Sequence, residues 1–174
     1  MSILDRIIMW LFNLKDMVSF NMSGAIGEHL RYGQIKGHQV NVGNNEWVAS
    51  QVVGNQSGKF VYHVAGALTL CVDSVAQIYG WAQERARTPT AGDTCVVNVA
   101  LDAVYRIPVN SGTYAKGMIG DMCDISVSSD VQGAQLNASS ENLLLVVGGD
   151  ATNNNWVDVK INPVVQGAST GVEA

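Results

Sequence analysis

Histidine and cysteine are the residues of this sequence whose chemistry could support metal binding or nucleophilic catalysis. The chain holds three of each: His29, His38, His63, Cys71, Cys95 and Cys123. No histidine stands at a metal-binding spacing from another histidine or from a cysteine. Each cysteine lies in an apolar, alternating stretch without a nearby cation, which does not favour a reactive thiolate. Three is an odd number and the spacings are long, so a disulfide framework is not expected. The pattern predicts reduced core thiols, with no metal and no other cofactor.

Carboxylates and serines also lack a catalytic arrangement. The sequence contains no nucleophile-elbow pattern and no glycine-rich phosphate loop after a strand. The segment around Asp150 has the sequence GGDATNNN, which resembles a calcium loop only loosely, because Asp150 and Asp158 are too few carboxylates. A hairpin connection is the simpler interpretation. We therefore predict that the protein is not an enzyme.

The composition points to contact with other protein rather than with nucleic acid. The chain has 174 residues, of which 47% are hydrophobic and 14% charged, against a usual charged share of about 25%. One interpretation is that partner chains cover part of the surface. The other is a neutral surface of Asn, Ser, Thr and Gly. The net charge is −5 and there is no run of Lys or Arg, so direct binding of nucleic acid is not expected.

The first 20 residues differ from the rest of the chain and predict an amphipathic helical arm. Apolar residues recur there at helical spacing: Leu4, Ile7, Ile8, Leu11 and Leu14. The apolar run is too short to span a bilayer and lacks the features of a signal peptide. The arm could dock on a partner or sister subunit, pack on its own domain, or lie on a membrane surface. Trp10 and Phe12 favour burial without choosing among these.

Residues 24–165 have the alternating pattern of β-strands, and residues 166–174 are small and polar, which predicts a flexible tail. Strands are expected over 39–42, 47–53, 59–64, 67–72, 76–82, 94–100, 103–108, 118–127, 143–147 and 156–162. Turns are expected at 43–45, 55–58, 91–93 and 110–112, and Pro108 is expected to end its strand. Many short strands with Gly- and Asn-rich turns predict a mainly β fold, either a small β-barrel or a β-sandwich.

One segment carries a resemblance to a known family. Residues 80–125, GWAQERARTPTAGDTCVVNVALDAVYRIPVNSGTYAKGMIGDMCDI, combine a Gly-Trp-Ala strand end, an Ala-Gly-Asp strand start, an AVYRIPV strand and a Gly-rich return. This layout resembles the β-domain of tailed-bacteriophage head decoration proteins, also called capsid cement proteins. A looser similarity continues to Val159.

The resemblance implies a virion structural protein on the exterior of an assembled capsid, made in the host cytoplasm. It implies a homotrimer that bridges subunits of the major capsid protein and stabilises the head, with no membrane partner. On this reading the arm would contact a capsid subunit or a sister subunit through apolar anchors. The residues we expect at capsid or subunit interfaces are Ile7, Trp10, Leu11, Phe12, Arg85, Arg87, Tyr105 and Arg106.

Arg85 and Arg87 form the only local cation pair, and a solvated loop is the alternative for them. The alternative for the whole protein is a receptor- or carbohydrate-binding β-module of a phage tail or fibre. Stacking faces would then come from Trp47, Trp81, Trp156, Tyr62 and Tyr114, which otherwise pack in a core or subunit interface. The N-terminal arm favours decoration, because a sugar-binding module has no need of one.

Overall fold

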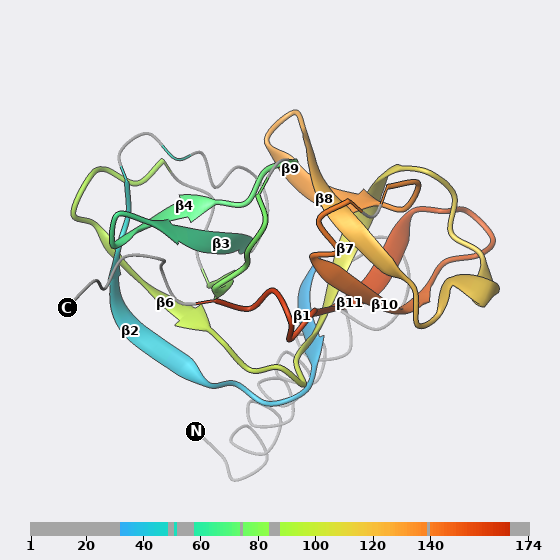
Figure 1. Ribbon diagram of the computed structural model, residues 1–174, viewed down its shortest axis with the longest axis horizontal. Helices are drawn as coiled ribbons and strands as arrows, with labels where there is room; N and C mark the ends of the chain where they lie inside the picture. Colours follow the sequence, from blue (N-terminus) through green and yellow to red (C-terminus); the bar gives the residue numbers. More distant parts are fainter. Residues whose placement is uncertain are drawn as a thin grey trace, which may run out of the picture. The chain divides into compact units, whose positions relative to one another are not determined.

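A computed structural model describes residues 32–48, 51, 58–73, 75–83, 88–138 and 140–167. The predicted helical arm over residues 1–20, with Ile7, Trp10, Leu11 and Phe12, lies outside the described residues, as do Arg85 and Arg87. The described part is mainly β and forms two sheets (Figure 1), which confirms the mainly β part of the predicted fold class.

The first sheet, which we call the N-barrel, consists of five short antiparallel strands in the order β2-β6-β5-β3-β4. These strands are β2 (Asn41–Glu46), β3 (Lys59–Val64), β4 (Ala67–Leu70), β5 (Gly80–Ala82) and β6 (Thr94–Asn98). Trp47, directly after β2, forms a parallel bridge with Leu68 of β4. The backbone N of Val48 donates to the Leu68 carbonyl at 2.9 Å. This single contact brings the two outer strands together and closes the sheet.

The second sheet, which we call the C-barrel, has the order β7-β11-β10-β8-β9 and a further pairing between β7 and β9. Its strands are β7 (Val104–Ser111), β8 (Met122–Ser128), β9 (Val131–Gln135), β10 (Leu144–Gly149) and β11 (Trp156–Ile161), with a short 3-10 helix, η1 (Lys116–Met118), before β8. The closing pair is parallel and joins Val109 to Ala134. The prediction of a small barrel therefore matches this connectivity better than a sandwich does.

The two barrels have the same topology. In each, the first strand pairs with the fifth, the fifth with the fourth, the fourth with the second and the second with the third, while the first and third strands meet in parallel. The first strand starts at residue 41 in the N-barrel and at residue 104 in the C-barrel. The fifth strand ends at residue 98 in the N-barrel and at residue 161 in the C-barrel, so both positions are displaced by 63 residues. The hairpins β3–β4 and β8–β9 both turn through two residues with positive φ, Ala65-Gly66 and Ser129-Asp130. The described part of the chain is therefore an internal repeat.

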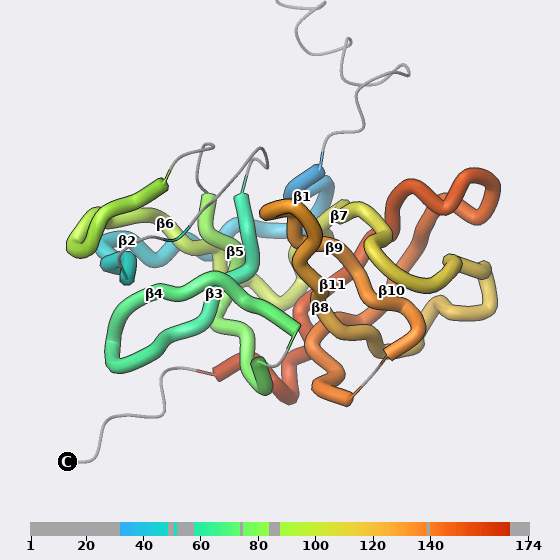
Figure 2. The backbone as a smooth tube through the Cα atoms, turned by 90° about the horizontal axis from the view of Figure 1, so that it is seen from above, coloured from blue at the N-terminus to red at the C-terminus, as the bar shows by residue number. Residues whose placement is uncertain are grey.

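A segment that we call the strap crosses from one barrel to the other. Its first strand, β1 (Gly33–Lys36), pairs antiparallel with β7 of the C-barrel, and the chain then continues into β2 of the N-barrel. Figure 2 shows the two strands at the blue end of the tube, β1 beside β7 and β2 beside β6. The strap is anchored between them by Asn98, whose Nδ2 donates to Gln34 Oε1 at 2.9 Å and whose Oδ1 accepts from Val40 N at 2.9 Å.

Two strands of the N-barrel, β3 and β5, bury residues on both of their faces. Val61, Leu68, Ala82 and Val97 pack inside the barrel with Trp47 and Cys95. The neighbouring residues Phe60 of β3 and Trp81 of β5 belong instead to the larger cluster that contains the C-barrel core. Because alternate side chains point to opposite faces, a strand buried on both sides needs a continuous apolar run. The start of β3, with Phe60 and Val61, has this character.

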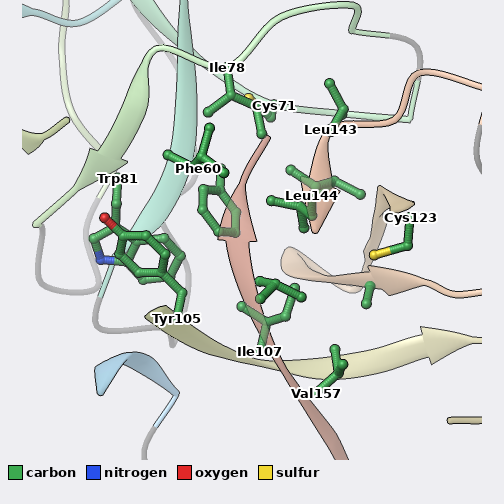
Figure 3. Close-up of a cluster of buried hydrophobic side chains, with 14 of the residues drawn as sticks. Phe60, Cys71, Ile78, Trp81, Tyr105, Ile107, Cys123, Leu143, Leu144 and Val157 are labelled. Carbon is green, nitrogen blue, oxygen red and sulfur yellow. The ribbon is translucent and has the colours of Figure 1, made fainter. Parts of the chain in front are cut away.

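Three aromatic rings form the centre of the joint between the barrels (Figure 3). Phe60 meets Trp81 edge-on with centroids 4.8 Å apart, and it meets Tyr105 edge-on at 5.3 Å. Trp81 and Tyr105 stack at 5.0 Å. All three side chains are buried. Phe60 and Trp81 come from the N-barrel and Tyr105 from the C-barrel, so the two repeats share one hydrophobic core.

A buried glutamine completes the joint. Gln132 of β9 accepts a hydrogen bond from Phe60 N at 2.7 Å, and its Nε2 donates to Phe60 O at 2.9 Å and to Cys71 O at 2.8 Å. The side-chain amide thus bonds the N-barrel backbone as a neighbouring strand would. Nearby, the buried ammonium of Lys59 donates to the Asp130 carbonyl. Burial lowers the pKa of Lys59, and the nearby Asp130 carboxylate opposes that shift.

Several sequence predictions need correction. The turn expected at 43–45 lies within β2, where Asn44 adopts a φ of 59° at an irregularity in the pairing with β6. Pro108 does not end its strand, since β7 continues to Ser111 and Pro108 pairs with Trp156. Strands β1 and β9 were not predicted. The tail predicted over 166–174 is wrong for Gln166, which bridges Ile78 and whose Nε2 donates to Val99 O at 2.9 Å, and residues 168–174 lie outside the described residues.

Candidate interaction surfaces

Tyr105 was expected at an interface and lies in the core instead. Its side chain is fully buried between Phe60 and Trp81, so it is not accessible to another chain. The hydroxyl has no hydrogen-bond partner among the described residues, and burial raises the pKa of this phenol. The expectation for Tyr105 is therefore wrong. Tyr105 lies on the inward face of β7, as Ile107 does.

Arg106, the neighbouring residue, points outward and is half-buried in a fixed position. Its Nε and Nη2 atoms donate to the two carboxylate oxygens of Asp158 at 2.8 and 2.9 Å. Its guanidinium carbon lies 3.6 Å from the centre of the Trp156 ring. A bidentate ion pair stacked on an aromatic ring is rigid, and Arg and Trp are common in the energetic centres of protein interfaces. The structure places Arg106 where a partner can reach it, at the outer face of β7 and β11.

The outer surface of the N-barrel carries little charge. Its five strands contain two charged residues, Lys59 and Glu46, and Lys59 is buried. Glu46 is therefore the one exposed charge among the described N-barrel strands. The strands of the C-barrel, by contrast, carry Arg106, Asp158 and Lys160 on one outer face. The sequence signal for this difference was present in the composition of the individual strands, although the overall charged share of 14% obscured it.

Large aliphatic side chains are exposed over much of the described surface. They are Ile35, Val40, Val42, Val64, Val72, Val96, Leu101, Ile119, Val127 and Val164. Five of these lie in or beside the N-barrel strands, where few charges surround them: Val40, Val42, Val64, Val72 and Val96. Single exposed aliphatic residues are ordinary in proteins, but charge depletion around several of them is characteristic of the central part of a protein interface.

The aromatic residues proposed as sugar-stacking faces are mostly inaccessible. Trp47, Trp81 and Tyr114 are buried. Trp156 is partly exposed, but the Arg106 guanidinium occupies one face of its ring. Tyr62 is partly buried and packs against the main core cluster. Three of the five rings are therefore inaccessible, and a fourth, Trp156, is covered on one face.

Cys71, Cys95 and Cys123 are buried in the structure. Burial raises the pKa of Cys71, whose Sγ lies 3.9 Å from the Gln77 carbonyl. Burial, with a smaller effect of the nearby Asp124 carboxylate, raises the pKa of Cys123 to about 12. Thiols in this state are poor nucleophiles at neutral pH.

Two acidic residues, Asp124 and Asp150, stabilise loops. Asp124 is buried and accepts four hydrogen bonds from residues 140–142, including Ser140 N at 2.8 Å and Asn142 N at 2.8 Å. Asp150 accepts from Thr152 N at 3.0 Å and from Asn153 N at 3.1 Å, and these bonds, led by that from Asn153, lower its pKa. Among the described residues, no group of three or more His, Cys, Asp or Glu side chains is arranged to hold a metal ion.

An open pocket of about 540 Å³ lies on the C-barrel. Its lining residues are Met118, Gly120, Asp121, Met122, Cys123, Leu136, Asn137, Ala138, Asn142 and Val146. Apart from the Cys123 thiol, Asp121 supplies the one ionisable side chain in this lining, and we assign no ligand to the pocket.

Comparison of the chain with protein-family models, with curated proteins and with solved structures finds no match. Over the residues that the structure describes, no helix combines the length and the apolar composition needed to cross a membrane.

Proposed function

We propose that this chain is a structural virion protein that binds the outer surface of an assembled phage head, bridges major capsid protein subunits and stabilises the head. On this proposal it acts as a homotrimer, performs no reaction and needs no cofactor. The observation that carries the proposal is the charge-poor outer surface of the N-barrel, on which Val40, Val42 and Val96 are exposed. Surfaces depleted of charge and carrying aliphatic side chains suit burial against protein.

The fold gives this surface a rigid support. The shared core and the Gln132 hydrogen bonds tie the N-barrel to the C-barrel, so the exposed side chains are held in a fixed arrangement. A protein that clamps a shell against outward pressure needs such stiffness, because each contact is repeated many times and must fit at every copy. The segment that resembles decoration proteins, residues 80–125, runs from β5 into β8 and includes two of the three rings of the joint, Trp81 and Tyr105.

The proposal is tested by sedimentation with capsids. The purified full chain is mixed with assembled phage heads that lack it, and bound protein is measured in the pellet as a function of concentration. We expect saturable binding at a stoichiometry set by the symmetry of the shell, and heads that resist heat or low salt better than undecorated heads. A chain that stays in the supernatant at micromolar concentrations overturns the proposal.

Matched variants locate the contact surface. Val96→Glu places a carboxylate on the N-barrel surface, and burying it in a contact costs more than about 1.4 kcal/mol, so we expect half-saturation to rise at least about tenfold. Ile119→Glu is the control, because Ile119 is 58% exposed and lies in the C-barrel, between η1 and β8. Equal binding by the two variants would remove the N-barrel surface from the proposal.

A further inference from the structure

The internal repeat reveals one position at which the two barrels differ. In the C-barrel both halves of the outer edge of β7 are paired: β1 lies against its first half, and β9 against its second half. In the N-barrel the second half of the equivalent edge of β2 is paired where Trp47 meets Leu68 of β4. The first half, residues 41–43, corresponds to residues 104–106, and no described strand pairs with its outer side.

The backbone groups on this half of the β2 edge are directed outward. Val99 N donates to Val40 O at 2.9 Å, so the backbone of Val40 faces β6, and that of Val42 does so two residues later. The N–H and C=O groups of Asn41 and Gly43 therefore point away from β6. They are able to form hydrogen bonds with an added strand.

This half of the edge is also exposed and uncharged. Residues 41–44 are exposed, and a Cβ added at Gly43 would meet no atom within 4 Å. The charged residues and prolines that normally prevent edge-to-edge pairing do not occur from Gln39 to Asn45. The chain has a net charge of −5, so two copies repel each other in general, and an uncharged edge is where this repulsion is weakest.

Val42 adds an apolar side chain to the edge. Its cross-strand partner Val97 is fully buried in the N-barrel core, and directly opposed residues share a face of the sheet. Val42 is nevertheless 36% exposed, and no described strand lies beyond it. The equivalent residue of the C-barrel, Tyr105, is fully buried, and Gln34 of β1 pairs with it. A strand added at the β2 edge gives Val42 comparable cover.

The edge is self-complementary when two copies meet about a two-fold axis at Val42. Asn41 of each copy then lies opposite Gly43 of the other, and both pairs exchange hydrogen bonds through their outward N–H and C=O groups. The two Val42 residues face each other as a non-hydrogen-bonded pair, the kind in which side chains lie closest. Pairs of β-branched residues in this arrangement stabilise a sheet.

We propose that the β2 edge of one copy, residues 41–43, pairs antiparallel with the same edge of a second copy, with Val42 opposite Val42 on a two-fold axis. The second copy thereby covers the N-barrel edge as β1 covers the edge of the C-barrel. This two-fold contact differs from the three-fold contacts of the proposed trimer and so goes beyond the proposed function. A contact between such short segments buries little area and is weak, so covalent trapping is the suitable test.

Disulfide trapping tests the two-fold pairing in the full chain. In the Val42→Cys variant the two thiols lie on the axis, where the Cα atoms are about 4.5 Å apart and within reach of a disulfide. Val40→Cys is the matched control, because Val40 lies on the same edge and is 52% exposed, but in this register its two copies are roughly 14 Å apart. We expect Val42→Cys to form disulfide dimers at least about tenfold faster. The native thiols are buried, and the parent protein measures their background.

A mixture of two differently tagged variants tests the direction of the strands. Antiparallel pairing about Val42 brings Asn41→Cys of one copy opposite Gly43→Cys of the other. We expect this mixed disulfide to form faster than either disulfide between like variants, because like Cα atoms are then roughly 8 Å apart.

A backbone substitution in the Val42→Cys variant tests the hydrogen bonds. Gly43→Pro removes the outward N–H, while Gly43→Ala keeps it, and circular dichroism checks the fold of both. The symmetry removes two hydrogen bonds from the contact at once, so we expect trapping to be at least about tenfold slower with proline than with alanine.

Three results would overturn the proposal. One is equal trapping of Val42→Cys and Val40→Cys, and another is faster linkage between like variants at Asn41 or Gly43. The third is equal trapping of the folded proline and alanine variants. All three experiments use purified protein without capsids, so a failure of the pairing is distinguishable from a failure of the proposed function.

Discussion

The two barrels follow one strand order but are completed in different ways. The C-barrel closes through a strand pairing of more than one residue, and β1 covers the remaining edge of β7. The N-barrel closes through the single bridge between Trp47 and Leu68 and leaves part of β2 open. It compensates by burying Phe60 of β3 and Trp81 of β5 against its neighbour. Among the described residues the N-barrel has six buried core residues of its own, and the second barrel that packs on its outside adds to this core.

The largest effect is expected at the aromatic joint. Phe60→Ala removes the ring that contacts both Trp81 and Tyr105, and we expect the free energy of unfolding to fall by about 3–5 kcal/mol. Unfolding in urea, followed by tryptophan fluorescence and by circular dichroism, measures the loss. Val96→Ala at the exposed surface is the control and should change stability by less than about 0.5 kcal/mol. A small effect of Phe60→Ala would mean that the barrels do not depend on each other.

A slightly smaller effect is expected at the polar part of the joint. Gln132→Ala leaves Phe60 N and the carbonyls of Phe60 and Cys71 without the amide that bonds them, so we expect a loss of about 2–3 kcal/mol. Gln135→Ala on the same strand is the matched control, because Gln135 is only half-buried. If both variants lose the same stability, the effect belongs to β9 in general and not to the contact between the barrels.

Thiol labelling compares the two barrels within one molecule. Cys95 lies in the N-barrel core and Cys123 in the C-barrel core, and both must be exposed by opening before they react. We expect Cys95 to be labelled about tenfold faster than Cys123 under native conditions, because the more weakly closed barrel opens at a lower free energy. Mass spectrometry of peptides from a time course gives the two rates. Faster labelling of Cys123 would reverse the order of stability that we assign.

The smallest effect concerns the strap. His38 donates from its backbone N to Asp102 Oδ2 at 3.2 Å, and its ring Nδ1 lies 2.5 Å from the same oxygen. These hydrogen bonds, that of the side chain first, lower the pKa of Asp102. Because the folded pKa lies below the unfolded one, the contribution to stability is present above about pH 4 and is lost as the pH falls through the folded value.

In Asp102→Asn the free energy of unfolding should therefore fall slightly less between neutral and acid pH than in the parent protein. The effect of Phe60→Ala should not change. Urea midpoints at about pH 7 and about pH 3 measure this difference. A variant with the same acid dependence as the parent protein would show that this pair does not hold the strap.

The sequence predicted many strands because alternation is a local property. The limits of β3 were predicted correctly, and the inward faces of β6 and β11, with Val97 and Val159 at their centres, follow directly from the two-residue period. β9 escaped prediction because its sequence VQGAQ has almost no apolar alternation, and its central role comes from the buried amide of Gln132. A polar residue that is satisfied by distant backbone groups has no signature in its own neighbourhood.

The internal repeat was also invisible in the sequence. The equivalent hairpin turns have the sequences Ala-Gly and Ser-Asp, which share a backbone conformation and no residue. The candidate surface was predictable only in outline. Low charge left two interpretations open, cover by partner chains or a neutral polar surface, and its concentration on the N-barrel strands depends on which strands lie together. Tyr105 was misplaced for the same reason, since its burial depends on rings supplied by the other barrel.

The hydrogen bonds of Gln132 also have a consequence for the order of synthesis. All five strands of the N-barrel are complete when residue 98 leaves the ribosome, but the partner of Phe60 O and Cys71 O lies 72 and 61 residues further along the chain. Gln132 lies 34 residues beyond residue 98, so at ordinary translation rates the delay is roughly 2–7 seconds. During that time Phe60 of β3 and Trp81 of β5 have no cover. Two neighbouring barrels of one topology are then at risk of exchanging strands, and their dissimilar sequences reduce the chance that a strand of one fits the other.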